Sequence, residues 1–437
     1  MKLESRIRKE FRKCAAPGDT ILRIMGGFHR LQLSATHLDG EISKLLFWSG
    51  LSFPSLKFSC AGKGISRELA LAGACAEAAE RISAGLYYTT FERSFRNPGV
   101  HRFYVARIND FLNFTYLDGY VCSHQNDLDN PLKIEDILIN ERYLTQEDLD
   151  CIKACDAGQH WVNGFSLTRQ TWMKVPIKLC SNWNGTNGLA SGNTLEEAIV
   201  QGANEIFERF AAISILRNNP ILPTIDPTSI LNPWIRDVIR CLKEKKIEVM
   251  IKDCTLGGLL PVAGVLFINH NIPEELAEHL LIFHGASFDS DEALIRCFLE
   301  RGQGHTDVDI PLPRSLDKTE DNTEDFLASF VRHSCRKNLS FFKEGPKVLY
   351  RRSTGPADCL DEIGEILRIC TRLNTDCVVV DFTHPVLAFP TVRILMPGVS
   401  DILSYSGKPK PRAYFTGGQD ENEQFYDVLS RMIRSFY

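Results

Sequence analysis

Three stretches of the sequence repeat one spacing of small and acidic residues that could hold a charged ligand. In each stretch a glutamate stands seven residues after an alanine, in a segment that follows glycine and other small residues. Further residues of the pattern stand four positions before and three positions after that glutamate. The glutamates are Glu77, Glu205 and Glu300, the preceding residues are Gly73, Gln201 and Arg296, and the following residues are Glu80, Glu208 and Gln303.

In a helix, residues four before and three after a given position lie on the same face, so each stretch predicts one polar stripe. Carboxylates three residues apart repel each other, and more strongly when partly buried, so a bound cation is the expected remedy. One charged helix of this kind is typical of a solvated outer face. Three helices with the same spacing favour a shared binding site instead.

The residue types in these stripes suit a magnesium-bound nucleoside triphosphate. Mg2+ takes carboxylate oxygens and keeps phosphate oxygens and water in its shell. Arg81, Arg209 and Arg296 could hold phosphate through the guanidinium group, and a glycine-led helix start also favours phosphate. The competing interpretation, a carboxylate-bridged di-iron site in an oxidase, expects Glu-x-x-His pairs, whereas the residue three beyond each glutamate is Glu or Gln.

The elements that must position these residues alternate along the chain. Segments rich in β-branched and aromatic residues predict strands. We expect a helical N-terminus, a helix in "LTQEDLDCIKAC" (144–155), and a helix capped by Thr194, with Glu197 completing a capping box. The predicted strands cover 44–51, 170–179, 247–254, 260–268, 279–288, 376–384 and 389–398.

This alternation predicts a mixed α/β or α+β architecture around extended sheets. We divide the chain into an N-terminal module, residues 1–60, that contributes to the nucleotide site, and a main domain, residues 61–437, with a polar helical connector at about 130–160. The charged segment 314–325 is expected to be a mobile loop or lid.

Composition narrows the choice of partners and compartment. The net charge of −5 and the lack of a long Lys/Arg run argue against nucleic acid or an anionic membrane as the main partner. No stretch is apolar enough for a signal peptide or a bilayer crossing, which predicts a cytoplasmic protein. The 14 cysteines form no CxxC pair, so we expect reduced thiols rather than disulfides or a zinc site.

The three stretches together resemble the YcaO family. The glycine–lysine–glycine run and the E-x-x-E-R helix of that family match residues 62–81. The family motif N-G-x-A-x-G-N-T, followed by Q-G-x-x-E-x-x-E-R, matches 187–209, and R-x-x-x-E-x-x-Q-G matches 296–304. The segments 161–167 and 392–401 look like strand signatures of the family. The resemblance implies a YcaO-type fold in which three glycine-led helices line a nucleotide site.

The resemblance also implies an activity and the residues that serve it. YcaO proteins use ATP to phosphorylate the oxygen of a peptide amide, giving azolines with a side-chain nucleophile and thioamides with sulfide. A general base is not assigned; His284 and His305 are candidates, and packed histidines are the alternative. By position, the cofactor contacts would be Lys13, Thr20, Arg23, Glu77, Arg81, Gln201, Glu205, Arg209, Arg296 and Gln303, and the metal ligands Glu77, Glu80, Glu197, Glu205, Glu208 and Glu300.

Departures from the family pattern narrow the expected activity. Gly73 replaces a serine of many members, and His305 replaces an arginine. The chain ends in "RMIRSFY" rather than in the proline-rich tail of azoline-forming members, which favours thioamide formation or a related sulfur incorporation. The alternatives are a nucleotide-binding accessory factor, of the type that assists methylthiolation of a ribosomal protein, and an azoline-forming cyclodehydratase.

The expected partners follow from the same resemblance. They are a peptide or protein substrate and a separate partner protein, which would be TfuA-like, ThiF-like or a methylthiotransferase. A homodimer is a further possibility.

Overall fold

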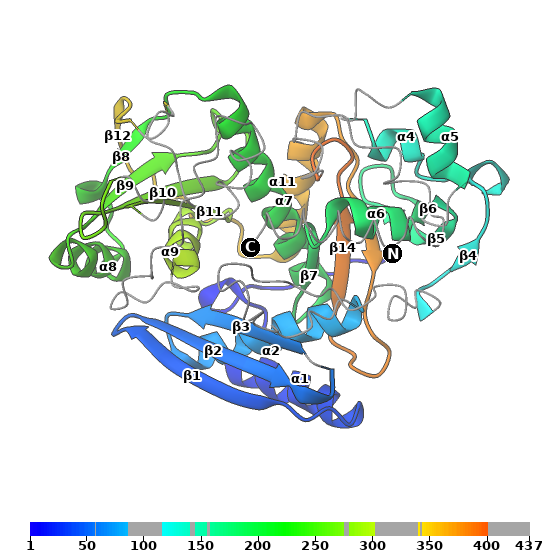
Figure 1. The fold of residues 1–437 in the computed structure, drawn as a ribbon, viewed down its shortest axis with the longest axis horizontal. Coiled ribbons are helices and arrows are strands. Elements are labelled where there is room, and N and C mark those ends of the chain that lie inside the picture. Colours follow the sequence, from blue (N-terminus) through cyan, green and yellow to red (C-terminus); the bar gives the residue numbers. More distant parts are fainter. Residues whose placement is uncertain are drawn as a thin grey trace, which may run out of the picture.

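The computed structural model describes residues 1–56, 58–85, 116–139, 145–154, 158–274, 279–301, 340 and 343–400. Gln303, His305, the charged segment 314–325 and the C-terminal tail lie outside these residues. In the described part of the chain the strands form three sheets, with α7 (Leu195–Asn218) and α11 (Cys359–Leu373) between two of them (Figure 1). The predicted mixed helix and sheet architecture is confirmed.

The first sheet is an antiparallel meander near the N-terminus. Strands β1 (Thr36–Ser43), β2 (Leu46–Phe53) and β3 (Phe58–Gly64) pair in chain order. Helix α2 (Arg67–Ser83) packs on β2 and β3, and α1 (Pro17–Arg30) packs on α2. The apolar side chains of both helices meet those of the sheet in one core, because Ile24 and Phe28 of α1 lie against the face that carries Phe53.

The second sheet has five strands in the order β11-β10-β9-β8-β12. The edge strand β11 (Leu280–Ala286) and its neighbour β10 (Val262–Asn269) are almost continuously apolar, because helices cover both faces. Leu266 belongs to the core shared with α7, whereas Val265 and Phe267 belong to the core shared with α8 (Pro233–Glu244) and α9 (Ser290–Arg301). The other strands are β8 (Thr224–Asp226), β9 (Ile247–Asp253) and β12 (Lys347–Leu349).

The third sheet has six strands in the order β4-β5-β13-β14-β7, with β6 paired to β5. Strand β14 (Thr391–Leu395) is entirely buried. Val392 and Ile394 face the core shared with α7, and Leu395 belongs to a separate core with Trp161. The other strands are β4 (Val121–Cys122), β5 (His160–Ser166), β6 (Thr171–Pro176), β7 (Leu189–Ser191) and β13 (Val378–Asp381), with α4 (Ile134–Ile137), α5 (Gln146–Ala154) and α6 (Ile177–Asn184) alongside.

The three helices of the sequence repeat are the helices that join the sheets. Helix α2 packs on β3 of the first sheet and also contacts β7 and β14 of the third. Helix α7 packs on β7 and β14 of the third sheet and on β11 of the second, and α9 packs on β10 and β11 and also reaches β3. Each of these helices therefore contacts strands of two different sheets.

Close packing explains the glycines and alanines of the repeat. A Cβ atom on Gly62 would lie 2.2 Å from the carbonyl oxygen of Ala70, and one on Gly285 would lie 2.3 Å from the carbonyl oxygen of Ala293. On Gly192 it would lie 2.6 Å from the amide nitrogen of Ala198. The glycine lets the backbone before each helix lie close to that helix. Part of the sequence repeat is therefore explained by close packing rather than by ligand binding.

Two expectations need adjustment. Residues 177–179 belong to α6 rather than to the predicted strand, because β6 ends at Pro176, which begins the helix. The N-terminal helix begins only at Pro17, since residues 1–16 run along α7 and α11 with one short 3-10 turn, η1 (Glu10–Arg12). The proposed division at residue 60 stays a prediction, and β3 spans that position.

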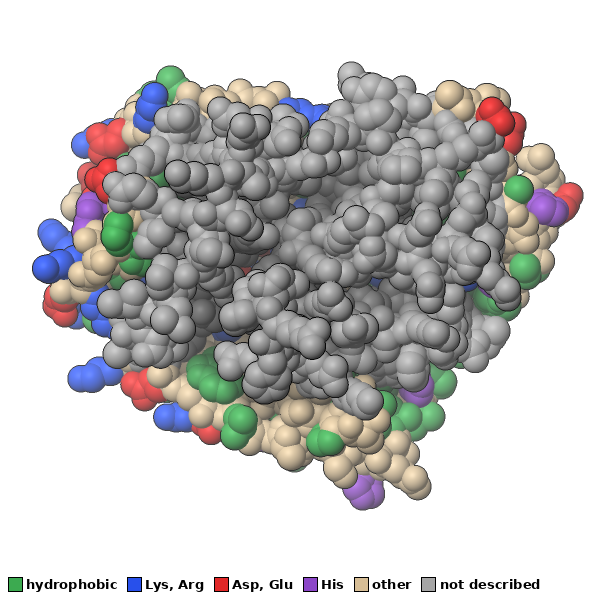
Figure 2. Space-filling model, in the orientation of Figure 1, with side chains coloured by type: hydrophobic (Ala, Val, Ile, Leu, Met, Phe, Trp, Pro, Cys, Tyr) green, Lys and Arg blue, Asp and Glu red, His purple; other side chains and the backbone are tan. Residues whose placement is uncertain are grey.

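Surface charge is mixed where the side chains are described. Figure 2 shows acidic and basic side chains interspersed along the edge of the molecule formed by β8, β9 and α8. Of the helices in the described ranges, none combines the length and the hydrophobicity that a bilayer crossing requires.

Candidate functional site

The glutamates of the repeat come from three helices and lie near one another. We call Glu77, Glu80, Glu205, Glu208 and Glu300 the three-helix site. The carboxylate of Glu205 on α7 interacts electrostatically with Glu300 on α9, and Glu80 on α2 interacts with Glu205. Glu208 also interacts with Glu300. The predicted convergence of the three stripes is therefore present in the fold.

Burial and mutual repulsion raise the pKa of three of these carboxylates, those of Glu80, Glu205 and Glu208. Burial raises the pKa of Glu80 to about 8, and the Glu205 and Glu77 carboxylates add to the rise, against the opposing effect of Arg81. Burial likewise raises the pKa of Glu208 to about 7, with Glu300 and Glu205 contributing. The pKa of Glu205 is raised by burial and by Glu300. The nearby arginines therefore neutralise only part of the negative charge that Glu80, Glu205 and Glu208 would carry if all three were ionised.

Cations lie at the edges of the three-helix site. Arg81 forms ion pairs with Glu80 at 3.1 Å and with Glu77 at 3.7 Å. Lys63 of β3 donates a 2.6 Å hydrogen bond to Glu300. Arg209 lowers the pKa of both Glu205 and Glu208, which places its charge beside them. Arginines therefore flank the acidic residues, as the sequence predicted.

The predicted Arg296 and Gln201 contact each other across two helices. Arg296 of α9 donates a 2.8 Å hydrogen bond to the side-chain oxygen of Gln201 on α7. Its Nε atom also lies 3.4 Å from Glu292, one turn earlier on α9. These contacts hold the guanidinium group between α7 and α9, one turn away from Glu205 and Glu300.

The N-terminal candidates gather around the start of α7. Lys13 lies 3.9 Å from Glu197, whose carboxylate accepts a 2.8 Å hydrogen bond from the amide of Cys14. Thr20 donates to the side chain of Asn193 at 2.8 Å, and Arg23 donates to the backbone carbonyl of Asn193 at the same distance.

Asn193 links these residues to Glu197. Its amide nitrogen lies 3.2 Å from both carboxylate oxygens of Glu197. Thr194 caps the helix as predicted, by accepting from the amide of Glu197 at 3.1 Å. The side chain of Glu197 contacts Cys14 and Asn193, about 12 Å along the helix from Glu205, since eight residues separate them. Glu197 therefore lies apart from the other predicted metal ligands.

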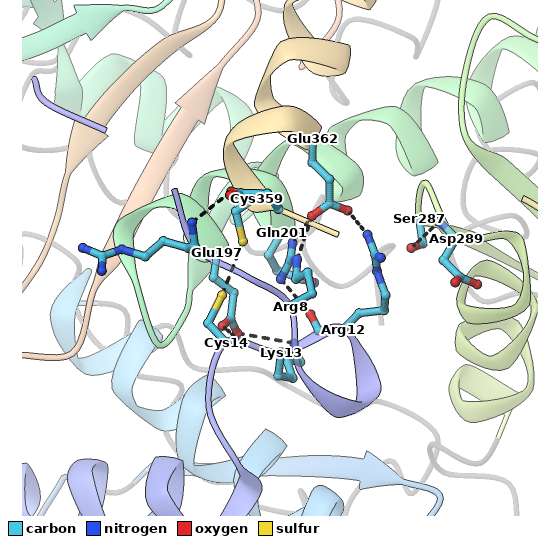
Figure 3. A network of polar contacts seen from close by, with 12 residues as sticks. Arg8, Arg12, Lys13, Cys14, Glu197, Gln201, Ser287, Asp289, Cys359 and Glu362 are labelled. Carbon is cyan, nitrogen blue, oxygen red and sulfur yellow. Dashed lines mark hydrogen bonds and ion pairs between the residues drawn. The ribbon is translucent and has the colours of Figure 1, made fainter. Parts of the chain in front are cut away.

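A second set of polar residues fixes the N-terminal segment in this place (Figure 3). Glu362 of α11 is buried and accepts hydrogen bonds from Arg8 at 2.7 Å and from Arg12 at 2.6 Å. The amide of Cys14 and the ammonium of Lys13 then reach Glu197. We call the set Arg8, Arg12, Lys13, Cys14, Glu197, Cys359 and Glu362 the N-terminal network.

Sequence reasoning missed three residues of the site. Lys63 stands in the quoted "GKG" run and Asn193 in "GNT", so both were visible in the motifs. Arg393 of β14 is 1% exposed, its guanidinium lies 5.7 Å from the Phe382 ring, and it interacts electrostatically with Glu80 and Glu205. Within the described residues its Nε and Nη1 atoms have no hydrogen-bond partner. An arginine inside an apolar strand was the signal.

Small residues beside the polar stripes serve protein packing. Ala79 and Ala203 are fully buried, and a Cβ on Gly202 would lie 2.9 Å from Ile394. Cys75 is a buried thiol, and His284 is buried in β11.

The donor set fits a nucleotide with magnesium. No three His, Cys, Asp or Glu residues in the described ranges form a ready metal cage. A cation held by one or two carboxylates, with phosphate oxygens completing its shell, is how Mg2+ usually binds with nucleotides. The raised pKa values of Glu80 and Glu208, and the unpartnered nitrogens of Arg393, indicate charges that a ligand would balance.

Comparisons with known proteins agree with this interpretation. Residues 61–400 match the family described as YcaO cyclodehydratase, ATP- and Mg2+-binding. A relative from Escherichia coli (strain K12), the ribosomal protein S12 methylthiotransferase accessory factor YcaO, is 27% identical over 359 residues. The alignment covers 78% of this chain and 57% of that relative, so the chain spans little more than half of the relative's length.

Two solved structures share the fold. A heterocyclase in complex with substrate and cofactor has a TM-score of 0.67 and 20% identity, over 93% of this chain and 55% of that chain. YcaO from Methanopyrus kandleri, bound with AMPPCP and Mg2+, has a TM-score of 0.57 and 18% identity, over 91% and 95%. The expected cofactors, ATP and Mg2+, are those in the description of the matching family. With the motifs, the fold and most of the chain in agreement, this protein belongs to the YcaO family.

Proposed function

We propose that this protein uses ATP and Mg2+ to activate a backbone amide of a peptide or protein substrate, so that sulfur replaces the amide oxygen. The observation that carries the proposal is the meeting of partly buried, mutually repelling carboxylates from α2, α7 and α9, flanked by arginines. When bound, ATP supplies the phosphoryl group that turns the amide oxygen into a leaving group.

The residues of the three-helix site would hold the metal and the phosphates. A bound cation would favour the ionised forms of Glu80, Glu205 and Glu208, because a nearby positive charge lowers their raised pKa values. Glu77 and Glu300 are more exposed, with 34% and 42% of their side chains accessible, and would contact the cation from the rim.

Basic residues would neutralise the phosphate charge. Arg81 and Arg209 lie beside the carboxylates and would stabilise the charge that develops during phosphoryl transfer. Lys13, Thr20, Arg23, Gln201 and Arg296 lie toward the start of α7 and would orient the rest of the nucleotide. Gln303 would take part from the end of the third motif.

A nucleotide-binding accessory role is the second candidate, because the E. coli relative is named as an accessory factor. In that case the protein would bind ATP and a methylthiotransferase without acting on an amide. The partner in the first case would be a separate TfuA-like or ThiF-like protein that delivers the substrate or the sulfur. An azoline-forming cyclodehydratase is a third outcome of the same test.

The test is to incubate the full chain with ATP, Mg2+, sulfide and candidate peptides, with and without candidate partner proteins, and to follow peptide mass. Replacement of one oxygen by sulfur supports thioamide formation, whereas loss of one water means azoline formation. ATP hydrolysis that depends on the peptide is expected in both cases. Tight nucleotide binding without hydrolysis or any mass change would establish the accessory role instead.

Matched variants show whether the three-helix site is responsible. Glu205→Gln keeps the size of the side chain and removes its charge, and it should abolish the mass change. Glu365→Gln on the surface of α11 is the control and should leave the mass change intact. Equal activity of the Glu205→Gln protein would overturn the proposed site.

A further inference from the structure

Two cysteines from distant parts of the sequence touch each other inside the N-terminal network. Cys14 precedes α1, and Cys359 is the first residue of α11. Their sulfur atoms lie 3.3 Å apart (Figure 3). Cys359 is fully buried, whereas Cys14 is partly accessible. A small reagent can therefore reach the Cys14 thiol, and the Cys359 thiol lies in contact with it on the buried side.

The surrounding contacts hold the two thiols together. The amide of Cys359 donates to the carbonyl of Arg6 at 3.0 Å, and the amide of Arg8 donates to the carbonyl of Ala357 at 2.7 Å. The buried ion pairs of Arg8 and Arg12 with Glu362 lock the same segment onto the first turn of α11. Because these contacts involve residues next to both cysteines, the pairing of the sulfur atoms is a fixed feature of the fold.

We propose that Cys14 and Cys359 form a redox-active dithiol, whose oxidation to a disulfide ties the N-terminal segment to α11 and weakens nucleotide binding at the start of α7. The effect on binding rests on the proposed function, whereas the disulfide does not. The oxidant would be a small two-electron oxidant such as hydrogen peroxide.

The chemistry uses the two thiols in order. The thiolate of Cys14 attacks one oxygen of the peroxide and becomes a sulfenic acid, and the hydroxide that leaves takes up a proton to form water. The Cys359 sulfur then attacks the Cys14 sulfur, the S–O bond breaks, and a second water leaves with the Cys359 proton. The two thiols lose two electrons, and the peroxide gains them.

Accessibility assigns these roles. Cys14 is partly accessible and Cys359 is fully buried, so Cys14 is the thiol that meets the oxidant first and Cys359 is the thiol that reacts with it afterwards.

The link to the nucleotide site runs through the backbone of Cys14. Its amide donates to Glu197 at 2.8 Å, and the adjoining Lys13 lies 3.9 Å from the same carboxylate. The sulfur atoms must close from 3.3 Å to a bond of about 2.05 Å, and the part of this movement that side-chain rotation does not absorb is passed to this backbone or to the start of α11. Lys13 and Glu197 would then change position relative to the rest of the nucleotide contacts.

The chain offers a built-in control pair. Cys370 and Cys377 also share a side-chain hydrogen bond, but both are fully buried in the large core around α7. Peroxide cannot reach either sulfur while the protein is folded. Both pairs have neighbouring thiols, but only the Cys14–Cys359 pair has a thiol that is accessible to the oxidant, so comparing them tests whether accessibility is required.

The test is to oxidise the full-length protein with hydrogen peroxide, block remaining thiols, and identify linked peptides by mass spectrometry without reduction. We expect a Cys14–Cys359 link in the wild type and none in Cys14→Ser or Cys359→Ser. Cys122→Ser, which removes an exposed thiol outside the pair, should still form the link. Absence of the link in folded wild-type protein, or an equal yield of a Cys370–Cys377 link, would overturn the assignment.

Affinity for a non-hydrolysable ATP analogue with Mg2+ is measured on the same samples. We expect about a five-fold loss on oxidation of the wild type, recovery with dithiothreitol, and no change on oxidation of Cys14→Ser, in line with a loss of about 1 kcal/mol. A link that forms without any change in affinity would refute the coupling. If the reduced protein binds no nucleotide, the proposed function fails, while the mass measurement still decides the fate of the dithiol.

Discussion

The N-terminal network buries its carboxylates fully and the three-helix site buries them in part, and the two regions differ in how the negative charge is neutralised. In the N-terminal network, Glu362 is paired with Arg8 and Arg12 at 2.6 Å each. In the three-helix site, Glu80 and Glu208 have pKa values raised to about 8 and about 7, because burial and neighbouring carboxylates outweigh the nearby arginines. The negative charge of Glu362 is balanced by the protein alone, whereas the carboxylates of the three-helix site would be balanced by a bound cation. The comparison separates an ion-pair set that holds the fold together, Glu362 with Arg8 and Arg12, from carboxylates that would bind a ligand.

The largest expected effect concerns ligand binding at the three-helix site. Replacing Glu205 by Gln should weaken binding of an ATP analogue with Mg2+ about 100-fold, because a lost contact to a charged group costs about 3 kcal/mol. The free energy of unfolding of the ligand-free protein should stay the same or rise, since a repelling charge is removed. Isothermal titration and urea unfolding measure the two quantities. A strongly destabilised Glu205→Gln protein would contradict this, because it would mean that Glu205 stabilises the fold as Glu362 does.

The opposite result is expected in the N-terminal network. Replacing Glu362 by Gln leaves Arg8 and Arg12 without their buried partner, which should lower the free energy of unfolding by about 3 kcal/mol. Urea unfolding checks this, and Glu365→Gln, on the surface of the same helix, should have almost no effect. An unchanged free energy of unfolding in Glu362→Gln would show that the ion pairs of Glu362 with Arg8 and Arg12 do not stabilise the fold.

The pH dependence sharpens the comparison. Glu80 and Glu208 have raised pKa values, so between the ordinary value of about 4.3 and about 8 the folded chain holds more protons than the unfolded chain. The contribution of these groups to stability therefore falls as pH rises through this window. Binding of Mg2+ with nucleotide needs the ionised forms, so affinity should rise roughly tenfold between about pH 6 and about pH 8.5, with proton release.

Titration in two buffers of different ionisation enthalpy measures the released protons. The pH slope should be smaller in Glu80→Gln. An affinity that is flat across this range would mean that these carboxylates do not ionise on binding.

The smallest expected effect tests a glycine in α2. A Cβ on Gly73 would lie 3.5 Å from its nearest neighbour, Gly62 Cα, so Gly73→Ser should fold normally. The added hydroxyl should strengthen nucleotide binding about three-fold, through one extra hydrogen bond of about 0.7 kcal/mol. Gly62→Ala is the contrast, because its Cβ would lie 2.1 Å from the Ala74 amide and overpacking costs about 1–3 kcal/mol. Equal stability of both variants would contradict the close packing of β3 and α2.

The sequence by itself determined the local pattern of this protein. Helical spacing placed Glu77 and Glu80, or Glu205 and Glu208, on one face, and runs of β-branched residues marked strands such as β9, β10 and β14. The motifs also named the family and its cofactors. Such features repeat over a few residues, so they can be read without knowing where the rest of the chain lies.

Only the tertiary structure decided which charges meet. Glu197 shares a helix with Glu205, yet it contacts the N-terminal segment, because residues 13 and 14 lie against the first turn of α7. Arg393 approaches Glu80 from another sheet, and Cys14 touches Cys359 across 345 positions of sequence. Contacts of this kind depend on how the second and third sheets and the N-terminal segment pack around α7, and no short-range pattern in the sequence encodes that packing.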